Sequence, residues 1–181
     1  RIAQLLAPHL DSAYYADADL LRKSALLLTD RPELAQGLLQ EANELLARAE
    51  ELNPLRAQTP YIHGLVLEQA SPDSPTEIID AYQTALKRNP RFLPARLALA
   101  HYLIEHDKND YAFQLLQDGL AFSYRQLTPA YFQLLEMNSA AAISMGNNEL
   151  ANYLNGLQEK YRQDYATMLS GQRSNKIVNP Y

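Results

Sequence analysis

The chain has 181 residues, 47% of them hydrophobic, no cysteine, and a formal net charge of −5 from 16 basic and 21 acidic residues. The lack of cysteine excludes a disulfide scaffold and thiolate metal sites, and mild acidity without clustered Lys and Arg argues against nucleic-acid binding. No segment approaches the ~20 consecutive apolar residues of a membrane-spanning helix, so we expect no membrane insertion by this region. The composition suits the cytoplasm and the periplasm equally. The chain begins with Arg1 rather than methionine, and we expect it to be a piece of a longer bacterial protein.

Every apolar run along the chain recurs at helical spacing, which predicts an all-α fold. The predicted helices cover residues 1–12, 13–28, 31–52, 60–70, 75–88, 93–105, 110–122, 129–146 and 148–169. Gly171 is expected to stop the last helix, because glycine is the common residue just beyond a helix end. Residues 172–181 lack periodicity and are expected to form a mobile tail.

Capping residues and prolines mark the predicted helix ends. The expected N-caps are Asp30, Thr59, Ser74, Thr128 and Asn147 or Asn148. A proline follows each of the first four within two residues, in the first turn, where it is tolerated. Glu77 stands three residues after Ser74 and would complete a capping box. Asn-Pro pairs at 53–54 and 89–90 are expected to end two helices.

The second helices of successive hairpins repeat one another. In the first of them a small, a large and a small residue and then a proline stand four, three and five positions apart: Ala42, Leu46, Ala49 and Pro54. The residues Ile78, Tyr82, Ala85 and Pro90 repeat that spacing. Small residues let two helices approach closely, large ones fill the space between hairpins, and proline breaks the chain. The resulting structural signature is Ala42, Pro54, Gly64, Tyr82, Ala85, Pro90, Ala100, Ala112, Gly146 and Ala151.

This spacing resembles the tetratricopeptide repeat family. The resemblance covers residues 20–122 well and residues 128–161 weakly. It implies a right-handed α-solenoid of about four helical hairpins, with an N-terminal extra helix and a long C-terminal capping helix. The hairpins would occupy residues 13–54, 57–90, 93–126 and 128–170 of a single domain spanning residues 1–171.

The resemblance also implies a function, because the first helices of such hairpins line a concave face that binds proteins or peptides. Carried over residue by residue, this groove is lined by Arg22, Tyr61, Leu65, Glu68, Leu97, His101, Ile104 and Glu136. One variant of the family grips a C-terminal carboxylate with Lys, Arg and Asn. That activity is not expected here, because the corresponding positions are Leu26, Ile62, Pro94 and Ala98.

Two alternative functions stay open. Residues 51–56 and 91–100 are similar to the repeat domain that follows the membrane part of O-antigen ligase and polymerase-like proteins. That similarity would imply a periplasmic module that supports polysaccharide assembly. The third possibility is a structural piece that associates with itself as a homo-oligomer.

The sequence carries no pattern for catalysis, a metal or a cofactor. His101 and Glu105 share a helix face, but His106 points about 100° away, so the three do not form a metal-binding set. His63, beside Gly64 in an apolar run, is expected to be a packed core histidine. A phosphate-binding glycine loop, a nucleophile elbow and a cysteine nucleophile are all missing from the 181 residues.

Overall fold

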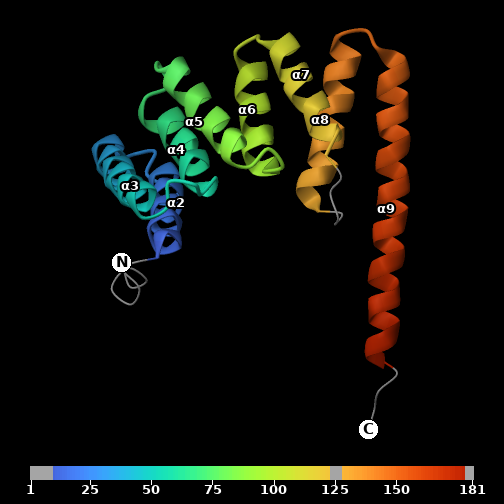
Figure 1. The fold of residues 1–181 in the computed structure, drawn as a ribbon, viewed down its shortest axis with the longest axis horizontal. Coiled ribbons are helices and arrows are strands. Elements are labelled where there is room, and N and C mark those ends of the chain that lie inside the picture. Colours follow the sequence, from blue (N-terminus) through green and yellow to red (C-terminus); the bar gives the residue numbers. More distant parts are fainter. Residues whose placement is uncertain (1–9, 123–127, 178–181) are drawn as a thin grey trace. The chain divides into compact units, whose positions relative to one another are not determined.

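The computed structural model describes the backbone of residues 10–122 and 128–177, and the side chains of residues 10–122 and 128–167. Within these ranges the chain forms eight helices and no strand, which confirms the all-α prediction (Figure 1). The helices are α2 (Asp11–Leu26), α3 (Pro32–Leu52), α4 (Gln58–Ala70), α5 (Pro75–Arg88), α6 (Leu93–Glu105), α7 (Asn109–Leu120), α8 (Pro129–Ser144) and α9 (Asn148–Ile177). None of the described helices has the length and apolar character needed to cross a membrane.

Two predictions at the chain ends have different outcomes. The predicted N-terminal helix lies almost entirely in residues 1–9, outside the described residues. At the other end, α9 passes through Gly171 and continues to Ile177, so the predicted helix end near Leu169 is wrong. A glycine within a helix costs about 1 kcal/mol relative to alanine, which weakens a helix without ending it.

The chain falls into two compact units, Arg1–Leu99 and Ala100–Tyr181, and α6 contributes to both. In unit 1, α2, α3 and α4 pack against one another around a cluster of small and branched apolar residues. The cluster contains Ala18, Ala25, Leu39, Ala42, Leu46, Ile62 and Val66. Ala18 and Ala42 in this cluster are fully buried.

An ion pair joins the start of α2 to the loop before α4. Arg56 donates from Nε and Nη2 to the carboxylate of Asp11, at 2.6 and 3.1 Å. Asp11 is 7% exposed. The hydrogen bond from Arg56 outweighs the opposing effect of burial and holds the pKa of Asp11 below its ordinary value.

The two Asn-Pro linkers of unit 1 have the same hydrogen bonds. The side-chain oxygen of Asn53 accepts from the N–H of Leu55, and its carbonyl accepts from Arg56. Asn89 makes the equivalent bonds to the N–H groups of Arg91 and Phe92. The two linkers therefore repeat at the 36-residue spacing that separates Pro54 from Pro90. In each linker an Asx turn follows the end of the preceding helix.

In unit 2, α8 packs against both α7 and α9. The buried apolar residues of these three helices are Ala112, Leu115, Leu116, Leu134, Leu135, Ala142, Ala151 and Leu154. Edge-on ring contacts join Tyr131 to Tyr161 and Phe132 to Tyr165 across α8 and α9. Fully buried Asn138 donates to the carbonyls of Leu116 and Leu134, and its oxygen accepts from Gln117. This interface therefore contains a buried amide whose hydrogen bonds are satisfied.

The helix caps agree only partly with the prediction. Thr128 accepts from the N–H of Tyr131, and Asn147 accepts from the N–H of Leu150, so both act as N-caps. Ser74 occupies the N-cap position of α5 but makes no side-chain capping bond. Thr59 lies inside α4, which begins one residue earlier and has Ala57 as its N-cap, and Arg31 rather than Asp30 precedes α3.

The hairpin turns of unit 2 use one backbone motif twice. Asp107 after α6 and Gly146 after α8 have φ angles of 58° and 74°. In each turn the backbone N–H of the next residue donates to the carbonyl oxygen five positions back. Lys108 donates to Leu103, and Asn147 donates to Ala142, both at 2.8 Å. This is the Schellman pattern, which satisfies the last carbonyls of a helix.

Candidate functional site

Four of the predicted groove residues lie together in unit 1, on a surface that we call the α2/α4 face: Arg22, Tyr61, Leu65 and Glu68. Tyr61 is half-buried, and its ring meets Phe92 edge-on with centroids 5.4 Å apart and lies 6.3 Å from the ring of Tyr82. Leu65 packs against the core cluster from the same side. This face therefore presents an aromatic ring whose position is fixed by two other rings.

Charged groups surround this ring. Arg22 donates from Nε and Nη2 to Oδ1 of Asp19, at 3.0 and 2.8 Å. Burial opposes ionisation of Asp19, but hydrogen bonds from Lys23 and Arg22 prevail and lower its pKa. On α4, Glu68 accepts a hydrogen bond of 2.5 Å from the hydroxyl of Tyr82. The Asp19–Arg22 pair and Glu68 are close enough to Tyr61 to act on its pKa, which burial raises above the ordinary value.

The other predicted groove residues lie on α6 and α8. Leu97 is buried, with 6% of its surface exposed, whereas Ile104 is 38% exposed. His101 is exposed, and its Nδ1 lies 3.2 Å from Glu105 on the next turn of α6. The structure therefore leaves His101 and Ile104 open to a ligand, while Leu97 supports the core.

The two histidines of α6 make different contacts. His106 stacks on the ring of Tyr102 with centroids 4.1 Å apart, whereas His101 lies beside Glu105. Its Nδ1 lies 2.7 Å from the carbonyl oxygen of Tyr102. Across the part of the chain that is described, no three His, Cys, Asp or Glu side chains gather as a metal site would require.

Glu136, the last predicted groove residue, lines an open pocket between α8 and α9 with a volume of about 640 Å³. Phe132 and Tyr165 form its aromatic wall, and Arg162 stands on the α9 side. We call this the α8/α9 pocket. Its aromatic residues could not be placed from the sequence, because the repeat pattern fades in this part of the chain.

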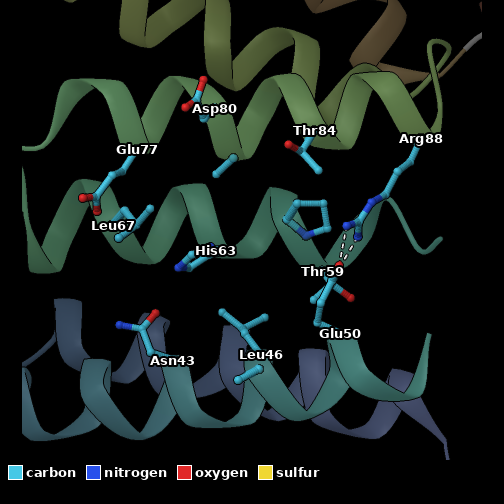
Figure 2. A pocket seen from close by; sticks show the side chains of 13 residues that line it. Asn43, Leu46, Glu50, Thr59, His63, Leu67, Glu77, Asp80, Thr84 and Arg88 are labelled. Atoms are coloured by element: carbon cyan, nitrogen blue, oxygen red, sulfur yellow. Dashed lines mark hydrogen bonds and ion pairs between the residues drawn. The ribbon is translucent and has the colours of Figure 1, made fainter. Parts of the chain in front are cut away.

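A second hollow of unit 1, which we call the α3/α5 groove, has a volume of about 540 Å³ and lies over α4 (Figure 2). Its lining comes from three helices: Asn43, Leu46, Ala47 and Glu50 of α3, Thr59, Pro60, His63 and Leu67 of α4, and Glu77, Asp80, Ala81, Thr84 and Arg88 of α5. Arg88 crosses the groove and donates to the carboxylate of Glu50 from both terminal guanidinium nitrogens, Nη1 and Nη2. Figure 2 shows His63 on the floor between α3 and α5.

The position of His63 corrects the sequence interpretation. His63 is exposed and lines the groove, whereas its neighbours Ile62 and Gly64 are buried. The apolar run around it predicted a core position, but rotation by 100° per residue carries it off the buried face. Desolvation in the groove lowers its pKa below 6.5, against the opposing fields of Glu77 and Glu50.

Sequence reasoning missed the α3/α5 groove altogether. Its residues lie on the second helices and on the side of α4 away from Tyr61, and none of the expected groove residues is among them. The one usable signal was the acidic pair at 77 and 80, three residues apart on the same helix face.

Comparison with known proteins bears on the fold. No family model matches the sequence, and no curated protein matches it. Among solved structures, one from the functional characterization of PilF of Pseudomonas aeruginosa matches with a TM-score of 0.57 and 18% identity, covering 87% of this chain and 71% of that chain. None of these comparisons supports the similarity to O-antigen ligase. At this identity the likeness shows the fold alone: the chain has an all-α, tetratricopeptide-like helical-repeat fold.

Proposed function

We propose that this chain is a non-catalytic protein-interaction module that binds a protein or peptide segment through the α2/α4 face. The observation that carries the proposal is Tyr61, a half-buried ring held edge-on by Phe92, with Arg22 and Glu68 beside it. Tyrosine and arginine are enriched among residues that dominate binding energy, especially where the side chain is already fixed before binding.

The fold supports this proposal. Helical repeats bind through extended faces made by successive helices, because each repeat packs only on its neighbours and leaves a side open. Within unit 1, the residues of the α2/α4 face, Arg22, Tyr61, Leu65 and Glu68, are all partly exposed. The proposal requires no metal or cofactor.

The chemistry of the face suggests the kind of ligand. Tyr61 and Leu65 offer apolar contact, and Glu68 and Asp19 contribute negative charge at its edge. A segment with one or two apolar anchors and flanking basic residues would match this arrangement, in the manner of peptides that bind helical grooves.

Site-specific photo-crosslinking tests the proposal. A photoreactive phenylalanine replaces Leu65 in one variant and Gln40, an exposed residue of α3, in the control, and both are irradiated in cells of the source organism. We expect a crosslinked polypeptide at position 65 only. Affinity for the polypeptide identified in this way should fall about tenfold or more in Tyr61→Ala, and it should not change in Tyr153→Ala, where the tyrosine is 64% exposed on α9.

Circular dichroism of the Tyr61→Ala protein shows whether its helices survive. If the crosslink forms equally at both positions, or if the folded Tyr61→Ala protein binds as tightly as the wild type, the α2/α4 face is not the binding surface. If the crosslinked polypeptide is a second copy of this chain, self-association replaces the proposed function.

A further inference from the structure

The α3/α5 groove contains more negative than positive charge. Glu77 and Asp80 stand on α5 at its rim, and neither has a hydrogen-bond or ion-pair partner among the described residues (Figure 2). Arg88 is the only Arg or Lys among the residues that line the groove. Its guanidinium is already bound to Glu50 and to the carbonyl oxygen of Arg56, the latter at 3.1 Å. Two carboxylates therefore face the solvent at this groove without a counter-charge from its walls.

Two further acceptors in the groove walls have no donor. Thr59 is 3% exposed, and its Oγ1 makes no hydrogen bond within the described residues. The same holds for Oδ1 of Asn43, which faces α4 from the opposite wall (Figure 2). Buried polar atoms without a partner are rare in folded proteins, because each costs free energy. Thr59 lies beside the Arg88–Glu50 pair, and Asn43 lies toward the other end of the groove, on the side of Glu77 (Figure 2).

The floor of the groove suits an aliphatic stem. Leu46, Pro60 and Leu67 give it an apolar surface, and the carboxylates lie above this surface on α5. Long basic side chains pack their methylene groups on apolar surface and keep the charged head among polar groups. Because the pKa of His63 is lowered by desolvation, its imidazole is neutral at pH 7 and does not repel a cation.

From these observations we infer that the α3/α5 groove binds an arginine side chain of a partner protein. The guanidinium would contact Glu77 and Asp80, toward the end of the groove where Asn43 also lies (Figure 2). Arginine fits better than lysine, because its five donors form a planar fork that can serve several acceptors at once.

This groove is separate from the α2/α4 face. On α4, Thr59, His63 and Leu67 follow one another at intervals of four residues and form one stripe. Tyr61, Leu65 and Glu68 form another stripe, roughly opposite the first at 100° per residue. The chain would therefore contact partners on two sides of the same helix.

The test uses the full 181-residue chain, labelled with ¹⁵N, and titrates it with N-acetyl-arginine methylamide. N-acetyl-citrulline methylamide is the neutral, nearly isosteric comparison. We expect saturating shifts of the amide signals of residues 63, 77 and 80 with the arginine compound only. The double variant Glu77→Gln with Asp80→Asn should bind it about threefold or more weakly. The control Glu44→Gln with Asp73→Asn removes the same charge at exposed positions outside the groove and should bind it as the wild type does.

Three results would overturn the inference. The citrulline compound could cause the same shifts, or the double variant could bind as tightly as the wild type. In the third, Tyr61→Ala would abolish the arginine shifts, which would place the binding on the α2/α4 face. The arginine titration of the α3/α5 groove does not depend on Tyr61. A negative titration would therefore contradict this inference and leave the proposed function of the α2/α4 face untouched.

Discussion

The ring of Tyr82 lies against the Cα atom of Gly64, so closely that a β-carbon at position 64 would be 2.6 Å from Cε1 of the ring. Tyr82 is fully buried, and its hydroxyl is bound to Glu68. The ring therefore has little freedom to move aside. The spacing between α4 and α5 depends on the missing side chain of Gly64.

This contact predicts that Gly64→Ala is destabilising, although alanine is the better helix former. We expect the free energy of unfolding to fall by about 1–3 kcal/mol, because the added methyl overpacks the α4–α5 interface. Urea unfolding followed by far-UV circular dichroism measures the change.

Gly37→Ala is the matched control. Gly37 lies within α3, and a β-carbon there would meet no atom within 4 Å. Alanine at this position should raise stability by about 0.5–1 kcal/mol, the usual gain over glycine inside a helix. Equal, small effects at the two positions would show that Tyr82 does not restrict position 64.

The Asp11–Arg56 pair predicts a second effect on stability. Arg56→Met keeps much of the aliphatic stem but leaves the buried carboxylate of Asp11 without its donor. We expect a loss of about 1–3 kcal/mol at pH 7. Arg31→Met is the control, because Arg31 and its partner Asp30 are both exposed and lie 3.8 Å apart. This substitution should change the free energy of unfolding by less than about 0.5 kcal/mol.

The pH dependence of this effect has a defined sign. The pKa of Asp11 is lower in the folded state than its ordinary value of 3.8. The pair therefore stabilises the fold above that pH, and its contribution is lost as the pH falls through the folded-state pKa. The difference between wild type and Arg56→Met should narrow below about pH 4, and a constant difference down to pH 2 would contradict this explanation.

His63 predicts a pH effect near neutrality. Its folded-state pKa is below 6.5, so the unfolded chain takes up a proton first as the pH falls. Stability should therefore decline as the pH drops from about 7 through 6.5 toward the folded-state pKa, and His63→Gln should lack this part of the decline. The ring-proton NMR signal of His63 gives the folded-state pKa directly, and a midpoint at or above 6.5 would contradict the prediction.

The last helix is expected to be required for the stability of unit 2. Truncation after Gly146 removes α9 and uncovers the buried side of α8, including Leu135 and Ala142. We expect aggregation or loss of cooperative unfolding, because a repeat end needs a cap. Truncation after Thr167 keeps the Tyr131–Tyr161 and Phe132–Tyr165 contacts and should stay soluble and cooperative. Light scattering and thermal unfolding compare the two, and an equally stable shorter protein would exclude the capping role.

The helices and their order could be predicted because proline and periodicity mark them directly. Pro75 and Pro129 stand at the first helical position, as the sequence predicts, and Pro32 does so one residue later than the predicted start of its helix. Caps were harder, because a side chain that can cap a helix does so only when the neighbouring backbone leaves an N–H within reach. Thr128 meets that condition and Ser74 does not.

The candidate sites were less predictable than the fold. Tyr61 could be proposed from its place in the repeat, but its contacts with Phe92 and Tyr82 depend on how three segments pack. The sequence analysis placed His63 in the core because its neighbours in the chain are apolar. Adjacent residues of a helix point 100° apart, so His63 can be exposed although its neighbours are buried. The α3/α5 groove brings together residues up to 45 positions apart, which no local pattern contains.

The Asp11–Arg56 contact also bears on the order in which the chain acquires structure during synthesis. Most packing in this fold joins helices that are neighbours in sequence, and such contacts form early and quickly. The donor for Asp11, however, lies 45 residues downstream, beyond the end of α3. The helices α2 and α3 can therefore pack on each other during synthesis, but Asp11 gains its ion pair only after the linker to the second hairpin has been made.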